Sequence, residues 1–178
     1  PWETAQDALR ELEEALPLEP ERFFVRYTDV VRHYGDARFD LHATEATTPE
    51  LLEQLRRLSE LTFEQRQAVS AVLDAADRIK GIRETVAGTN IQILDVKLDN
   101  SDHPTAKANV EAVITKYPDI ACLVGIFSYN GPAIADVVMS KNLKGKVKVV
   151  CFDEDALTLK AVKDGVIEAT VVQDPFAF

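Results

Sequence analysis

The C-terminal half of the chain contains the stretch that decides the fold, residues 121–173, which read ACLVGIFSYNGPAIADVVMSKNLKGKVKVVCFDEDALTLKAVKDGVIEATVVQ. Short apolar runs rich in β-branched residues, which are typical of buried strands, alternate in it with segments of helical periodicity. This alternation predicts βα units and a parallel sheet. The strands are expected at 121–127, 146–152 and 168–173, and the helices at 131–142 and 155–165.

The same pattern extends toward the N-terminus. Residues 91–98 (IQILDVKL) predict another strand, and residues 104–117 predict the helix that follows it. Because crossovers between parallel strands are right-handed, the leading topology is a doubly wound, flavodoxin-like α/β sheet. In such a sheet, ligands bind beyond the carboxyl ends of the strands.

The first part of the chain is expected to be mainly helical. Apolar residues at helical spacing predict two helices before residue 36. Thr4 and Asp7 resemble a capping box at the start of the first helix, and Gly35 is the expected end of the second. Thr47 and Thr62 are the expected caps of two later helices, the second of which extends at most to Gly88.

One segment in this part has the alternation of a strand instead. Residues 38–44 (RFDLHAT) alternate apolar and polar side chains and predict a short strand.

The charge pattern separates the chain into two segments. Residues 1–80 contain nine arginines and one lysine, whereas residues 81–178 contain one arginine and nine lysines. Both side chains are cationic, so folding alone does not demand this switch. The hypothesis is that two segments of different origin join near residues 75–82, which gives domains at 1–77 and 78–178.

Composition and motifs exclude several functional classes. A net charge of −10 disfavours nucleic acids and anionic membranes as partners. No apolar run approaches the roughly 20 residues that span a bilayer, and the N-terminus lacks the layout of a signal peptide. Without a G-x-S-x-G, C-x-x-C or H-E-x-x-H motif, no catalytic residue, metal or cofactor is predicted. Cys122 and Cys151 are expected to be buried, unpaired thiols.

Polar and aromatic residues follow every predicted strand. Carboxylates, amides and an aromatic face suit a neutral, hydroxyl-rich ligand, whereas a phosphate needs a glycine-rich loop or basic residues. The segments concerned are Asp99 to Asp102, Ser128 to Asn130, Asp153 to Asp155, and Asp174 to Phe176.

Several of these residues have a simpler alternative role. Asp153, Ser128 and Asn130 could each cap the helix that follows, and the run from Asp153 to Asp155 is better explained as a solvated helix start than as a metal site. Gln173 ends a strand and has no capping role. A receiver-like fold with a phosphoacceptor aspartate is a further alternative, for which Asp95 is a weak candidate because it lies within a predicted strand.

Three motifs in a fixed order carry a family resemblance. FSYNGPA (127–133), VVCFDED (149–155) and TVVQDPF (170–176) resemble the C-terminal lobe of bacterial periplasmic sugar-binding proteins, the ribose-binding, type I class that serves ABC transporters. The resemblance covers about residues 78–178. It implies solute binding without catalysis, a periplasmic or extracellular location and, in a full-length parent, a membrane permease as partner.

The resemblance also implies which residues bind the ligand. Asn130, Asp153 and Gln173 match the family positions that contact a neutral pentose or hexose, although Cys151 stands where the family usually has glycine. A carboxylate that accepts hydroxyl hydrogen bonds and amides that both donate and accept suit such a sugar.

The departures from the family are equally specific. Nothing before residue 76 resembles the other lobe of the receptor, and Ala76 stands where the family has a binding arginine. The lobe also lacks its first strand, which is central in a sheet of order 2-1-3-4-5, and the chain stops before the crossover to the other lobe. Residues 38–44 are the only strand-like candidate for the empty place.

An incomplete lobe leads to two competing expectations. The first is half of a carbohydrate receptor with little or no affinity alone, whose exposed aromatic residues Tyr129, Phe176 and Phe178 favour a homodimer. The second is an engineered or recombined chimera in which the lobe is only a scaffold for an interaction module.

Overall fold

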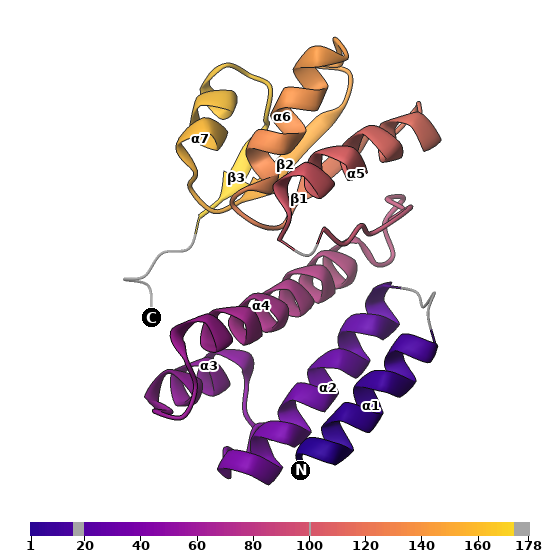
Figure 1. The fold of residues 1–178 in the computed structure, drawn as a ribbon. Coiled ribbons are helices and arrows are strands. Elements are labelled where there is room, and N and C mark those ends of the chain that lie inside the picture. Colours follow the sequence, from indigo (N-terminus) through magenta and orange to yellow (C-terminus); the bar gives the residue numbers. More distant parts are fainter. Residues whose placement is uncertain (16–19, 100, 173–178) are drawn as a thin grey trace. The chain divides into compact units, whose positions relative to one another are not determined.

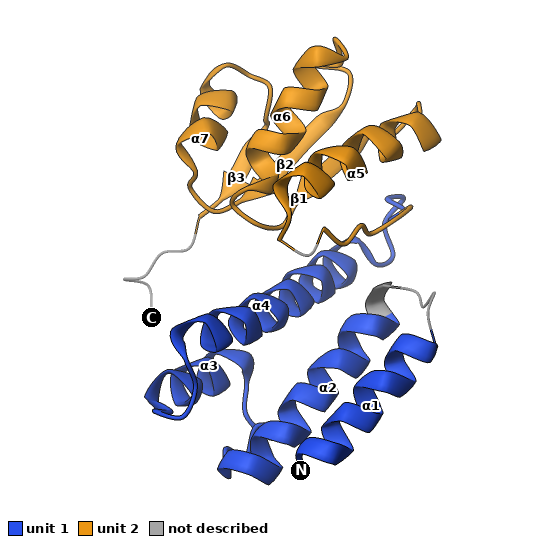
Figure 2. Ribbon diagram, in the orientation of Figure 1, with its two compact units in different colours: residues 1–93 blue, residues 94–178 orange. Residues whose placement is uncertain are grey.

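The computed structural model describes residues 1–15, 20–99 and 101–172 (Figure 1). The contacts among them define two compact units, residues 1–93 and residues 94–178 (Figure 2). The first unit is helical, and the second contains a parallel sheet with helices. The expected α/β fold with a mainly helical segment before it is therefore confirmed.

The described part of unit 1 forms four helices. They are α1 (Trp2–Glu14), α2 (Pro20–Phe39), α3 (Thr48–Arg57) and α4 (Phe63–Val86). α1 packs on α2, and both α2 and α3 pack on α4. A buried cluster that includes Leu51, Leu55 and Leu73 forms a core of this unit. α4 runs without a break through residues 75–82, where the arginine-rich part of the sequence gives way to the lysine-rich part.

The two threonine caps predicted from the sequence are confirmed. Thr47 and Glu50 form a capping box at α3, and Thr62 and Gln65 form one at α4. In each box the N3 side chain accepts a hydrogen bond from the threonine N–H, at 2.8 Å from Glu50 and 2.9 Å from Gln65. These bonds satisfy backbone N–H groups at the point where the helical ladder begins.

The start of α1 differs from the prediction. The helix begins at Trp2 with Pro1 as its N-cap residue, so Thr4 lies inside the helix. Asp7, the other half of the predicted capping box, accepts instead from the Arg10 guanidinium at 3.0 Å. The carbonyl oxygen of Pro1 accepts the first hydrogen bond of the helix, from the N–H of Ala5 at 3.1 Å.

The strand predicted at residues 38–44 is wrong. α2 continues past the buried Gly35 and ends at Phe39, and the next residues turn toward α3. Asp40 and His42 have φ angles of 54° and 48°, a left-handed backbone that an extended strand cannot contain. The alternating apolar residues Leu41 and Ala43 are buried, but they are placed by a loop.

Two charged residues of α2 hold this loop in place. The Arg32 guanidinium donates to the carbonyl oxygens of Ala43 and Ala46 and to the Thr48 hydroxyl. The Asp36 carboxylate accepts from the N–H of Ala43 and from the Thr44 hydroxyl. These bonds satisfy backbone groups that a strand would pair with a neighbour, so tertiary contacts override the local alternation.

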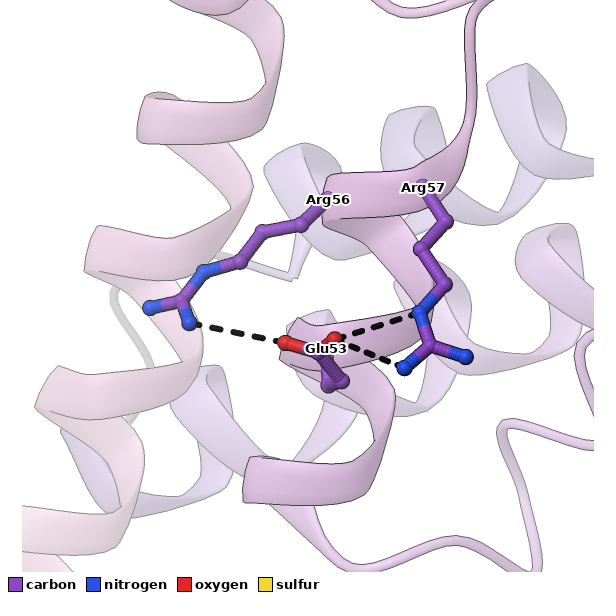
Figure 3. Close-up of polar contacts among 3 residues, drawn as sticks. All are labelled: Glu53, Arg56 and Arg57. Carbon is purple, nitrogen blue, oxygen red and sulfur yellow. Dashed lines mark hydrogen bonds and ion pairs between the residues drawn. The ribbon is translucent and has the colours of Figure 1, made fainter.

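Near the C-terminal end of α3, one acidic side chain lies between the side chains of two arginines. Glu53 accepts from Arg57 at 2.9 and 3.1 Å and lies 3.6 Å from Arg56 (Figure 3). All three side chains are at least half exposed, so the ion pairs add little to stability. The two arginines nevertheless favour the helix, because positive charge stabilises its C-terminal end.

The described residues of unit 2 form three parallel strands and three helices. The elements are α5 (His103–Lys116), β1 (Cys122–Gly125), α6 (Asn130–Ser140), β2 (Lys148–Phe152), α7 (Ala156–Lys163) and β3 (Ala169–Val171). The strand order is β1-β2-β3. Val124 is paired with Val150, and Cys151 with Thr170. The predicted parallel sheet and its βα alternation are confirmed for these elements.

The described helices of unit 2 cover one face of the sheet. Leu123, Val149 and Cys151 point into a core completed by side chains of α5, α6 and α7. Val124 and Val171, at the alternate positions, are 43% and 49% exposed. Cys151 is buried as expected, but Cys122 lies at an exposed position, so that part of the prediction is wrong.

The strand predicted at residues 91–98 does not form. These residues belong to no helix or strand, and Ile91, Leu94 and Leu98 are exposed. Side chains of α5 hold part of the segment, because Lys116 pairs with Asp95 at 3.2 Å and the Asn109 amide donates to the Leu98 carbonyl at 2.9 Å. A strand needs a neighbouring strand to pair its backbone groups, and none of the described strands pairs with this segment.

Candidate functional site

The candidate site lies at the carboxyl edge of the sheet in unit 2. β1 ends at Gly125, and a short loop leads to Asn130, the first residue of α6. β2 ends at Phe152, and Asp153 follows it directly. Because β1 and β2 are parallel neighbours, the structure brings these predicted residues to the same edge of the sheet.

Both the oxygen and the nitrogen of the Asn130 side-chain amide form hydrogen bonds. Its Oδ1 accepts from the N–H of Phe127 at 2.9 Å, and its Nδ2 donates to Oδ2 of Asp99 at 3.0 Å. The predicted capping role is absent, because Tyr129 is the N-cap residue of α6 and no side chain caps this end. Asn130 is therefore fixed in one orientation beside the end of β1.

Tyr129 lies in a stack of three rings. Its ring is parallel to that of His103 at 4.9 Å between centroids and to that of Phe127 at 5.8 Å. Its hydroxyl donates to Oδ1 of Asp99 at 2.6 Å. Burial, together with the hydrogen bond to Asp99 and its negative charge, raises the pKa of Tyr129 to about 12.

Two glycines allow the backbone to approach closely here. A Cβ on Gly125 would lie 2.8 Å from Cβ of Asn130, and a Cβ on Gly131 would lie 2.1 Å from the hydroxyl oxygen of Thr158. Neither spacing is compatible with a larger side chain. Gly125 thus lets Asn130 sit against the end of β1, and Gly131 lets α6 approach α7.

Asp153 and Asp155 have different roles after β2. Asp153 has a φ angle of 67°, its N–H donates to the Val171 carbonyl at 2.8 Å, and its carbonyl accepts from the Thr170 hydroxyl at 2.7 Å. Asp155 caps α7 by accepting from the N–H groups of Leu157 and Thr158. The capping role expected as an alternative for Asp153 is therefore wrong, because Asp155 is the cap of α7. Asp153 instead has a backbone tied to β3 and a half-buried side chain.

The remaining predicted residues lie elsewhere. Gln173 falls outside the described residues. Asp95, the weak candidate for a phosphoacceptor, lies between Lys97 and Lys116, each at 3.2 Å. These lysines hold the pKa of Asp95 below its usual value, against the opposing effect of burial. Among the described residues, no group of three potential ligands is placed to hold a metal ion.

The sequence did not indicate that Asp99 meets Tyr129 and Asn130. Thirty positions separate Asp99 from Tyr129, and the predicted strand before Asp99 does not form. The available signal was weak: Asp99 and Asn130 both follow predicted strands, and strand ends of a parallel sheet share an edge.

A family model described as the periplasmic binding protein domain matches residues 61–178, about two thirds of the chain. The chain belongs to this family. The matched region includes α4 and every helix and strand of unit 2. No described helix combines the length and the apolar composition needed to cross a membrane.

The solved structures that are similar to the chain include the following two. One is an ABC transporter solute binding protein from Agrobacterium vitis with bound D-fucose, 18% identical, with a TM-score of 0.47, and the match covers 82% of this chain and 58% of that protein. The other is GanP, a glucose-galactose binding protein from Geobacillus stearothermophilus, 16% identical, with a TM-score of 0.47, and the match covers 97% of this chain and 70% of that protein. The chain therefore spans little more than half the length of the first protein. No curated protein matches the chain.

Proposed function

We propose that the chain from residue 78 onward is half of a carbohydrate receptor of an ABC transporter. It binds its solute without catalysing a reaction. The join expected near residues 75–82 lies inside both α4 and the family match at residues 61–178, so a helical segment of separate origin would have to end before residue 61. Membership in the periplasmic binding protein family supports solute binding and a periplasmic or extracellular location. In a full-length receptor the partner is a membrane permease.

The observation that carries the proposal is the position of Asn130 and Asp153. The two residues follow neighbouring parallel strands and so lie at one sheet edge, with a carboxylate on one residue and an amide on the other. A carboxylate accepts hydrogen bonds from sugar hydroxyls, and an amide can both donate and accept. This set of groups suits a neutral pentose or hexose, and we assign Gln173 as the third contact.

The affinity of the chain alone is expected to be low. A ligand at one sheet edge keeps much of its surface in water, and water weakens each hydrogen bond by competing for it. Binding in the millimolar range or weaker corresponds to at most about 4 kcal/mol. Calorimetric titration with ribose, xylose, galactose or glucose is therefore expected to give no measurable heat, and micromolar affinity would overturn this expectation.

A method that detects weak binding tests the function itself. Two-dimensional NMR with each sugar at millimolar concentration is expected to shift backbone signals around Asn130 and Asp153, and Asp153→Asn is expected to abolish those shifts. Asp119→Asn removes the same charge at an exposed position and is the matched control. If no sugar shifts the signals at this edge, the sugar-binding proposal is wrong.

An alternative function is a chimeric scaffold in which the lobe has only a structural role. The exposed apolar face of the sheet, with Val124 and Val171, favours association with another protein or a second copy. On this alternative, sugars leave the edge signals unchanged, while line widths increase with protein concentration because the chain forms a homodimer.

A further inference from the structure

We propose that Asp99 is a positioning residue that fixes the orientation of the Asn130 amide and thereby decides which hydrogen-bonding groups the sheet edge offers to a ligand. The proposal rests on the proposed function for the nature of the ligand, but the contact between Asp99 and Asn130 can be tested without any ligand. Asp99 reaches the site from the loop before α5, which no family position assigned above includes.

Both carboxylate oxygens of Asp99 are used in this contact. Oδ1 accepts from the Tyr129 hydroxyl at 2.6 Å and from the N–H of Ser101 at 3.0 Å, and Oδ2 accepts from the Asn130 amide at 3.0 Å. Hydrogen bonds to a charged group are roughly twice as strong as those between neutral groups. One side chain thus holds two consecutive residues at the start of α6.

The consequence for Asn130 follows from counting its donors and acceptors. An amide side chain has two N–H donors and two acceptor lone pairs. Asp99 takes one donor, and the N–H of Phe127 takes one lone pair. One N–H and one lone pair remain in a known orientation. This arrangement recognises a hydroxyl, or a pair of adjacent hydroxyls, that can accept one hydrogen bond and donate another.

The ring contact between His103 and Tyr129 supports the hydrogen bond between Asp99 and Tyr129. His103, at the start of α5, packs flat on Tyr129, so the loop that carries Asp99 is tied to the loop after β1 by both a ring contact and a hydrogen bond. Tyr129 is half-buried, and the raised pKa of its hydroxyl agrees with a proton held against Asp99. A carboxylate here therefore has a neutral donor from Tyr129 throughout the physiological pH range.

The test is the side-chain amide signal of Asn130 in the full chain near neutral pH. In the wild type, one of its two N–H protons is expected to be shifted downfield and to exchange slowly with water. Asp99→Asn is expected to remove both properties, because a neutral amide cannot accept from Tyr129 and Asn130 in the same way. Tyr129→Phe keeps the contact between Asp99 and Asn130, so it is expected to retain the protected signal, as is the charge control Asp119→Asn.

A second readout confirms that each variant is folded and that the contact is the cause. The circular dichroism spectrum of Asp99→Asn is expected to match that of the wild type. The pKa of Tyr129, followed by tyrosinate absorbance and assigned by its absence in Tyr129→Phe, is expected to fall below about 12 in Asp99→Asn. It is expected to stay above the ordinary value of about 10, because burial is the larger cause of the shift and remains. An unchanged Asn130 amide signal in folded Asp99→Asn would overturn the proposal.

The effect of Asp99 on sugar affinity is measured in a separate experiment. Where the wild type shows sugar-dependent shifts, Asp99→Asn is expected to weaken binding about tenfold or more, while Tyr129→Phe weakens it less. Equal affinity in Asp99→Asn and the wild type would also contradict the proposal. If the wild type binds no sugar, the proposed function fails, yet the amide signal still decides whether Asp99 positions Asn130.

Discussion

Units 1 and 2 each use a carboxylate to hold a loop, but the two loops have different consequences. In unit 1, Asp36 and Arg32 of α2 hold the connection to α3, over fewer than twenty positions of sequence. In unit 2, Asp99 holds Tyr129 and Asn130 at the edge of a parallel sheet, about thirty positions away. The first contact completes a helical core, whereas the second orients an amide that faces the candidate site.

The two units depend on different kinds of contact to fold. Unit 1 depends on signals within a few residues, such as the capping boxes at Thr47 and Thr62. Unit 2 depends on pairing between residues that are 19 to 26 positions apart, such as Cys151 with Thr170 and Val124 with Val150. Local signals can be read from the sequence, but long-range pairing requires partners that are present in the folded chain.

The largest expected effect comes from truncating one core residue in each unit. Leu73 in unit 1 and Ile167 in unit 2 are both 1% exposed, so alanine leaves a cavity in either core. We expect Leu73→Ala and Ile167→Ala each to lower the free energy of unfolding by about 2–5 kcal/mol. Amide hydrogen exchange is expected to show the greatest loss of protection in the unit that carries the change.

Leu159→Ala is the matched control for this pair, because Leu159 is 48% exposed and its loss is expected to cost no more than about 0.5 kcal/mol. Equal loss of protection in both units from either core variant would show that they unfold together and would weaken the division at residue 93.

Replacing a glycine by alanine is expected to raise the free energy of unfolding in unit 1 and to lower it in unit 2. Gly81 lies inside α4 with no atom within 4 Å of an added Cβ, so Gly81→Ala is expected to stabilise the chain by about 0.5–1 kcal/mol through helix propensity. Gly131 has the Thr158 hydroxyl 2.1 Å from an added Cβ, so Gly131→Ala is expected to destabilise it by about 1–3 kcal/mol. Urea denaturation measures both changes, and the same sign in both would contradict the close approach of α6 to α7.

The smallest expected effect is the pH dependence contributed by Asp36. The Thr44 hydroxyl, followed by the backbone N–H groups of Ala43 and Thr44, lowers the pKa of Asp36 below its usual value near 4. A carboxyl whose pKa is lower when folded stabilises the chain above the unfolded pKa, and it loses that contribution as the pH falls through the folded pKa. Thermal unfolding is expected to show Asp36→Asn less stable than the wild type near neutral pH, with the difference disappearing in acid.

Glu53→Gln is the control for Asp36→Asn, because Glu53 makes only exposed ion pairs with Arg56 and Arg57. It is expected to change stability by about 0.5 kcal/mol or less. If Asp36→Asn stays less stable than the wild type at the lowest pH, a cause other than its charge is responsible.

Part of the fold could be predicted because its signals are local. The caps at Thr47 and Thr62 mark the starts of α3 and α4, and the apolar runs at 121–127, 146–152 and 168–173 contain β1, β2 and β3. The two wrongly predicted strands have an alternating sequence but no described strand beside them to pair with. Residues 91–98 alternate apolar and polar side chains, but none of the described strands pairs with them. Residues 38–44 also alternate, but after the end of α2 they form a loop that is hydrogen-bonded to Arg32 and Asp36.

The candidate site divides in the same way. The sequence by itself determined the residue types at the strand ends, Asn130 and Asp153, and with them the chemistry of amide and carboxylate toward a hydroxyl-rich ligand. Only the tertiary structure decided that Asp99 reaches Tyr129 and Asn130, and so which way the amide points. The physical reason is that composition and periodicity are properties of neighbouring residues, whereas a hydrogen bond between distant residues exists only after the folded chain has brought both partners together.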